Sequence, residues 1–138
     1  MNSAMFKYFV LILLTATFAC NQSEQTNKRI SKSQLEDMFR AMKNGGMNPN
    51  NELVWSYYFI DKDTLNLHNL ANKLVAGGYT FVAIINIEGD GGPTNEFRLH
   101  MSKVEKHSVE SLHQRNSQFY KLCESLGVME YDGMEVGK

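Results

Sequence analysis

Side chains that could bind a metal ion are spread along the chain without close pairs. The sequence has four histidines and two cysteines, namely His68, His100, His107, His113, Cys20 and Cys123. A zinc site needs three or four converging ligands, which usually come in tight pairs such as C-x2-C or H-x3-H. No such pair occurs, and His107 and His113 are separated by five other residues. We therefore expect no metal and no cofactor, and we assign all four histidines to surface positions of helices and strands.

A glycine-rich stretch, GDGGP at residues 89–93, is a second feature that could serve chemistry. A phosphate-binding loop requires a strand before it and a helix after it, so that amide groups point at the anion. Here both flanking segments have the pattern of a strand, which favours a hairpin turn. No nucleophile-elbow motif accompanies the serines and histidines. The sequence therefore does not indicate an enzyme.

The segment YDGMEVG, residues 131–137, combines an aromatic residue, an acid and a glycine. An active-site loop, half of a metal site or a final strand could each use these types. No base or nucleophile is recognisable near Asp132, so a strand is the better interpretation. Tyr131 would then pack, and Asp132 with Gly133 would form a bulge or bend, as glycine in a strand often does. Tyr131, Asp132 and Gly133 are therefore a candidate structural or binding motif.

The first residues resemble the signal peptide of a bacterial lipoprotein. Lys7 precedes an apolar run over residues 8–19, which is shorter than the roughly 20 residues that a membrane-spanning helix needs. Its length fits the apolar region of a signal peptide, and the alternative is a buried core helix. The run ends in Ala19-Cys20, similar to a lipobox, in which a small residue precedes the cysteine that becomes acylated. We therefore expect Cys20 to carry a lipid anchor.

This interpretation divides the chain into three parts. Residues 1–19 would be the signal peptide, residues 20–30 a flexible tether without apolar period, and residues 31–138 the folded domain. The protein would then be lipid-anchored in the bacterial cell envelope, on the periplasmic or surface side. Acylation of Cys20 would leave Cys123 alone, so no internal disulfide could form. Because Cys123 lies among apolar helix positions, we expect it to be buried and inert.

Length and charge narrow the possibilities further. The chain has 138 residues, of which 43% are hydrophobic, which is enough for the core of one domain. Fifteen acidic residues nearly balance fourteen Lys and Arg, giving a formal net charge of −1. A nucleic-acid-binding domain usually carries a basic patch, so a nucleic-acid partner is not expected.

Hydrophobic periodicity predicts the order of the elements. A one-sided helix over residues 33–43, capped by Ser31 or Ser33, is followed by an alternation of strands and helices. The predicted strands are residues 53–60, 79–88, 95–104 and 128–136, and the further helices are residues 67–75 and 108–126. This β-α-β-β-α-β order is typical of the ferredoxin-like α+β fold, a four-stranded antiparallel sheet with helices on one face. We expect strand 53–60 beside strand 95–104 at the centre of the sheet.

In this fold the two helices cover one face of the sheet, and the other face is open. Arg98, His100 and Ser102 alternate with apolar residues along their strand and are assigned to this open face. Either Trp55, Tyr57 and Phe59 or Val54, Ser56 and Tyr58 would lie beside them. Aromatic residues with arginine can stack single-stranded RNA, but the glycine-spaced aromatic signature of RNA-recognition domains is absent. The alternative is that the helix at residues 33–43 covers this face.

Two stretches resemble the family of regulators of ribonuclease E activity, B type (RraB). LVAGGYTF, with Gly78-Tyr79, is similar to that family's helix-to-strand junction, and LCESLGVMEYDG is similar to the end of its last helix and its Tyr-Asp-Gly strand. Where family members carry Trp after this motif, the chain has Met134. The resemblance covers residues 33–136 and implies the same fold and a non-catalytic, protein-binding role. The family's bacterial regulator binds a scaffold region of ribonuclease E in the cytoplasm, which an exported lipoprotein cannot meet.

Two functional hypotheses follow from the sequence. The first is a membrane-tethered, protein-binding regulatory module that acts as an inhibitor. The second is an extracytoplasmic domain that binds a small ligand on the open sheet face or beside the Tyr-Asp-Gly motif. An exposed apolar patch would favour a protein partner, whereas a closed cavity would favour a small ligand.

Overall fold

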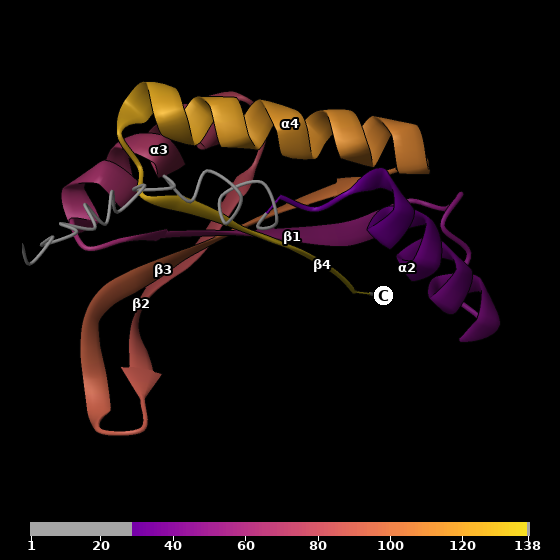
Figure 1. Ribbon diagram of the computed structural model, residues 1–138. Coiled ribbons are helices and arrows are strands. Elements are labelled where there is room, and N and C mark those ends of the chain that lie inside the picture. Colours follow the sequence, from indigo (N-terminus) through magenta and orange to yellow (C-terminus); the bar gives the residue numbers. More distant parts are fainter. Residues whose placement is uncertain (1–28, 138) are drawn as a thin grey trace, which may run out of the picture.

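The computed structural model describes residues 29–137, and its labels are those of Figure 1. The elements follow one another as α2 (Lys32–Asn44), β1 (Leu53–Asp61), α3 (Thr64–Ala76), β2 (Thr80–Gly89), β3 (Gly92–Glu105), α4 (Val109–Leu126) and β4 (Glu130–Gly137). The predicted signal peptide and Cys20 lie outside the described residues. Within residues 29–137, no helix has the length and apolar character needed to cross a bilayer.

The four strands form one antiparallel sheet in the order β2-β3-β1-β4. The predicted β-α-β-β-α-β order and ferredoxin-like α+β fold are therefore confirmed, as is the helix that precedes them. Strand β1 lies beside β3 at the centre, with Tyr57 opposite Met101 and Phe59 opposite Leu99. Residues 89–93 form the β2–β3 hairpin turn, with Gly89 paired to Gly92.

Polar side chains cap the first turns of the helices, and Ser31 is one of the two caps that the sequence predicts for α2. Ser31, Asp63 and Ser108 accept hydrogen bonds from backbone amides of the first turns of α2, α3 and α4. These caps satisfy amides that have no partner within the helix. Helix α4 ends at Gly127, whose φ of 66° is left-handed and suits glycine.

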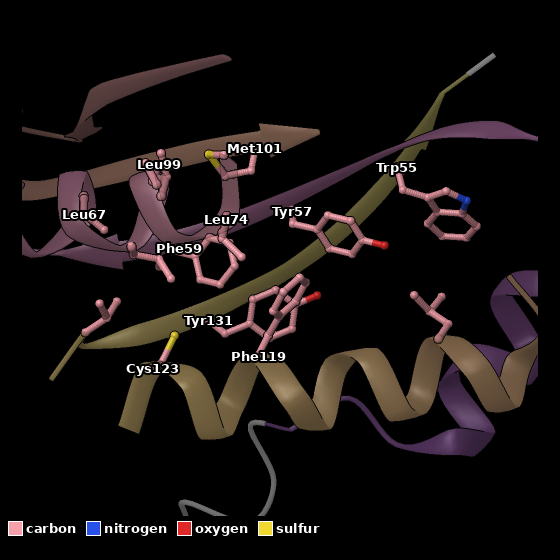
Figure 2. Close-up of a cluster of buried hydrophobic side chains, with 14 of the residues drawn as sticks. Trp55, Tyr57, Phe59, Leu67, Leu74, Leu99, Met101, Phe119, Cys123 and Tyr131 are labelled. Atoms are coloured by element: carbon pink, nitrogen blue, oxygen red, sulfur yellow. The ribbon is translucent and has the colours of Figure 1, made fainter. Parts of the chain in front are cut away.

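The core lies between the sheet and the helices, and it is built around the odd-numbered residues of β1. Trp55, Tyr57 and Phe59 are fully buried on this side (Figure 2). Figure 2 also shows Phe119 of α4 and Tyr131 of β4 facing them. Of the two sets that the sequence leaves open, Val54, Ser56 and Tyr58 are therefore the one on the open face.

Helix α2 packs on the same side as α4, at one end of the sheet (Figure 1). The ring of Phe39 stacks on that of Trp55, with a centroid distance of 6.2 Å. Because Trp55 belongs to the helix-covered face, α2 does not cover the open face, and that alternative is wrong. Among the described residues, no helix covers the open face.

Strand β2 differs from the other strands in its surroundings. Its sequence is apolar on both faces over residues 81–85, yet among the described residues it pairs with β3 alone. Phe81, Val82 and Ile85 are 43%, 46% and 55% exposed. The hairpin of β2 and β3 also projects away from the helices (Figure 1). The most apolar strand of the chain is thus an exposed edge.

Candidate functional site

Tyr131 of the YDG motif is a core residue. Its side chain is 4% exposed, and its ring packs against Phe59 and Phe119 at centroid distances of 5.2 Å each. The hydroxyl donates a hydrogen bond of 2.7 Å to Asn116 Oδ1. Burial raises the pKa of Tyr131, so the hydroxyl remains a donor. The packing that the sequence predicts for Tyr131 is therefore present.

Asp132 and Gly133 form an irregularity in β4. The register with β1 shifts between Tyr58 and Phe59, which pair with Gly133 and Tyr131, so Asp132 is the extra residue of a bulge. Gly133 has a φ of 100°, a left-handed conformation that favours glycine. The Asp132 carboxylate lies 3.1 Å from the Arg98 guanidinium. The bulge therefore directs the acid of the motif toward β3.

The three open-face residues of β3 join a polar and aromatic surface. His100 Nε2 lies 2.8 Å from Ser56 Oγ, and its ring lies 4.8 Å from that of Tyr58. The Tyr58 hydroxyl donates a 2.8 Å hydrogen bond to Glu135. Burial lowers the pKa of His100, against the opposing effect of Glu135, which favours the neutral imidazole at pH 7. Ser102 lies on the same face, opposite Ser56.

Arg98 links the two sets of candidate residues that the sequence identifies separately. Its guanidinium lies 5.8 Å from the Tyr58 ring centroid and also pairs with Asp132. The side chains of Arg98 and Asp132 are 39% and 31% exposed. Tyrosine and arginine are enriched at the energetic centres of protein interfaces. We call the surface formed by Ser56, Tyr58, Arg98, His100 and Asp132 the open-face patch.

A second polar group lies inside the molecule, where the sequence analysis did not find it. Glu105, at the end of β3, accepts hydrogen bonds from Tyr57 at 2.6 Å and from Arg115 at 2.7 Å. His107 Nε2 lies 3.0 Å from the Tyr57 hydroxyl and 3.1 Å from Glu105. The Tyr57 hydroxyl donates its only proton to Glu105. His107 Nε2 is therefore the donor in its contacts with the Tyr57 hydroxyl oxygen and the Glu105 carboxylate. The surface position expected for His107 is wrong, because the residue is 5% exposed.

The charges of this inner network stabilise one another. Burial alone would raise the pKa of Glu105, but hydrogen bonds from His107, Tyr57 and Arg115 lower it to about 2. Burial raises the pKa of Tyr79, whose hydroxyl accepts a hydrogen bond from Arg115, to about 12. The network therefore holds a permanent ion pair between β3 and α4. One signal in the sequence points to it, because Arg115 interrupts the apolar stripe of α4.

The Cys123 thiol, a further group that could react, is packed in the core. Cys123 is 5% exposed, and burial raises its pKa to about 12, as expected of an inert thiol. Among the described residues, no three His, Cys, Asp or Glu side chains converge on a position for a metal ion.

A cleft of about 350 Å³ lies beside the start of β4. Arg29 and Glu124, which line it, form a 2.6 Å ion pair.

The motifs from the two halves of the domain meet in the core. Tyr79 follows α3 and Tyr131 follows α4, yet both rings contact Phe119, at centroid distances of 5.8 and 5.2 Å. Gly78 has a φ of 89°, which suits the turn into β2. The rings of Tyr79 and Tyr131 are thus part of the core packing, whereas the open-face patch faces solvent.

Comparison with known proteins gives one match. Residues 32–136 match the family model described as "Regulator of ribonuclease activity B". A search of curated proteins finds no match. The matched residues include every helix and strand in Figure 1 apart from the last residue of β4.

Proposed function

The chain belongs to the RraB family, and from that premise we propose that it is a non-catalytic regulatory module that binds a protein while a lipid on Cys20 holds it at the bacterial cell envelope. The family match supports the regulatory, protein-binding part of this proposal. The N-terminal sequence supports the anchor, since its apolar run ends in Ala19-Cys20. The family match is the observation that carries the function.

The open-face patch is the surface that we assign to the partner. It combines a tyrosine, an arginine and a histidine that keep contact with solvent, together with the acid of the YDG motif. Such a surface offers both apolar area and directional hydrogen bonds, which suits recognition of a folded protein. Ser56 Oγ and His100 Nε2 lie 2.8 Å apart on this surface, and we assign this polar pair to partner binding.

The anchor determines which partners are available. A lipoprotein beyond the cytoplasmic membrane shares no compartment with a cytoplasmic ribonuclease. The partner that we propose is therefore a protein of the cell envelope, and the module would inhibit or regulate that protein by occupying one of its surfaces.

Metabolic labelling with a fatty acid tests the anchor. Wild type is expected to take up the label and to fractionate with membranes, and Cys20→Ser is expected to lose both properties. Cys123→Ser is the matched control, because it removes the other thiol of the chain and should keep the label. Equal labelling of wild type and Cys20→Ser would refute the anchor while leaving the binding function intact.

Cross-linking in intact cells followed by purification of the tethered protein tests the partner. Tyr58→Ala and Arg98→Ala are expected to reduce capture at least tenfold without lowering the melting temperature, as for central interface residues. Glu110→Gln is the control, since it changes an exposed residue on α4. If capture falls only in variants that also unfold, the open-face patch is not the binding site.

A domain that binds a small ligand is the second candidate, favoured by the cleft of about 350 Å³ beside β4. This volume is at the lower end of the range for ligand pockets. A rise in melting temperature with periplasmic small-molecule extract would favour this candidate if Arg29→Ala abolished it. An unchanged melting temperature would favour the protein partner.

A further inference from the structure

Strand β2 has the sequence of an inner strand but the position of an edge strand. Residues 80–87 contain no charged side chain, and strands buried on both faces typically read as continuous apolar runs. Soluble proteins usually protect an exposed edge with lysine, proline or a bulge, because free backbone groups invite another strand. Residues 80–87 contain neither lysine nor proline, and the bulge that β2 carries at Val82 leaves residues 83–86 regular. Here Phe81, Val82 and Ile85 are 43%, 46% and 55% exposed. The apolar character of β2 is thus unexplained by the contacts of the described residues.

The irregularities of β2 leave a regular segment at its centre. The register with β3 shifts between Phe81 and Ala83 and again between Asn86 and Glu88. Residues 83–86 between these shifts pair regularly, with Ile84 opposite Leu99 and Ile85 opposite Arg98. Among the described residues the outer edge of this segment pairs with no strand, and four regular residues with uncharged side chains are enough to begin a strand pairing.

We propose that a second copy of this chain docks along β2, antiparallel to it, and extends the sheet of each copy across a two-fold axis. An axis perpendicular to the sheet through Ile84 would place Ile84 opposite its own equivalent and Ala83 opposite Ile85 of the second copy. In antiparallel pairs, directly opposite residues share a face. Both copies would therefore keep their helices on one side of a continuous sheet. This inference is independent of the lipid anchor and of the partner assigned to the open-face patch.

Charge complementarity favours a second copy over an unrelated strand. Lys103 belongs to β3, and its Nζ reaches the start of β2, 3.4 Å from the Gly77 carbonyl oxygen and 4.6 Å from the Tyr79 ring centroid. Glu88 and Asp90 lie at the other end of β2 and in the turn, and both are exposed. Antiparallel pairing brings the end of β2 beside Lys103 in one copy toward the end with Glu88 and Asp90 in the other. Because residues 80–87 are uncharged, no like charges lie opposite each other at the centre of the pairing.

Disulfide cross-linking of the full chain, with Cys123 replaced by serine and the chain that keeps only Cys20 as the baseline, tests the geometry. Residues on a two-fold axis between antiparallel strands have a Cα separation of about 4.5–5.5 Å, which is within disulfide range. Ile84→Cys is therefore expected to form a disulfide-linked dimer under mild oxidation. Leu65→Cys and Val104→Cys are controls, because both positions are more than 60% exposed but lie off the β2 edge. Cross-linking of the controls with none at residue 84 would overturn the proposal.

Sedimentation of the full chain in neutral detergent tests the energetics. Wild type is expected to be dimeric, and Ile85→Lys is expected to weaken association at least ~100-fold, because it sets charged groups within an apolar pairing. Val104→Lys is the matched control, at a site 61% exposed on β3. Glu88→Lys and Lys103→Glu should each weaken association, and the double exchange should restore it. A monomeric wild type, or a dimer that Ile85→Lys leaves unchanged, would refute docking along β2.

Discussion

Replacement of Glu105 by glutamine removes the negative charge of the inner network while keeping the shape of the side chain. In the wild type, Arg115 Nη1 lies 2.7 and 3.0 Å from the two carboxylate oxygens, and the Glu105 side chain is 13% exposed. The variant leaves Arg115, whose side chain is 21% exposed, without its counter-charge. Loss of one partner of a fully buried pair costs ~3–5 kcal/mol. Since some solvent reaches this pair, we expect the free energy of unfolding to fall by roughly 2–4 kcal/mol.

The same replacement should change how stability depends on pH. The pKa of Glu105 is about 2 in the folded protein and 4.5 in the unfolded chain. A carboxylate with a lowered folded-state pKa stabilises the fold above its unfolded-state pKa. This contribution, roughly 3 kcal/mol, is lost as the pH falls from about 4.5 toward 2. The slope of stability against pH in this window should therefore be smaller in Glu105→Gln than in wild type.

Urea unfolding followed by tryptophan fluorescence measures both effects. Trp55 is the only tryptophan, is fully buried and lies 5.1 Å from the His107 ring, so its emission reports on this part of the core. Glu110→Gln is the matched control, because Glu110 forms an exposed pair with Lys32, and exposed pairs contribute little. Equal loss of stability in the two variants, or an unchanged slope between pH 5 and 2 in Glu105→Gln, would refute the role assigned to the network.

Three further predictions concern the YDG strand and its neighbours. Tyr131→Phe keeps the ring but leaves Asn116 Oδ1 without its donor, so thermal unfolding should show a loss of ~1–3 kcal/mol. Gly133→Val introduces a β-branched residue at a φ of 100° and should lower the melting temperature more than Asp132→Asn does. Cys123, with a pKa raised to about 12, should react with an aromatic disulfide reagent in the unfolded state and not in the folded state; rapid labelling of the native protein would contradict its burial.

The fold could be predicted from the sequence because each helix and strand has its own hydrophobic periodicity or capping residue. The apolar spacing in α4 and the alternation in β3 specify helix and strand without knowledge of their neighbours. Ser31, Asp63 and Ser108 mark the helix starts, and each of them caps its helix in the structure. The central position of β1 followed from the connection order, since two β-α-β units with a hairpin between them leave few arrangements.

The exposed position of β2 and the partners within the inner network could not be predicted, because both depend on contacts between distant parts of the chain. A continuous apolar run predicts burial on both faces, and only the sheet order makes β2 an edge. His107 becomes buried because the loop after β3 turns it toward Tyr57 and Trp55. Glu105 and Arg115 meet across two elements, and neither position carries a periodic signal that predicts its partner. Pairings between distant residues depend on register, which single-residue patterns do not encode.

The residues of the YDG motif divide between the core and the surface of the fold. Tyr79 and Tyr131 meet at Phe119, and Gly133 adopts a left-handed conformation, so these residues are constrained by packing and backbone geometry. A surface position such as Arg98 is under no such constraint, because its side chain is 39% exposed and substitutions at exposed positions usually change stability little. Tyr131 and Gly133 are therefore constrained by the fold, whereas exposed residues of the open-face patch, Asp132 included, can change without loss of the scaffold. A shared signature then predicts the scaffold, and the identity of the partner has to be determined from the surface.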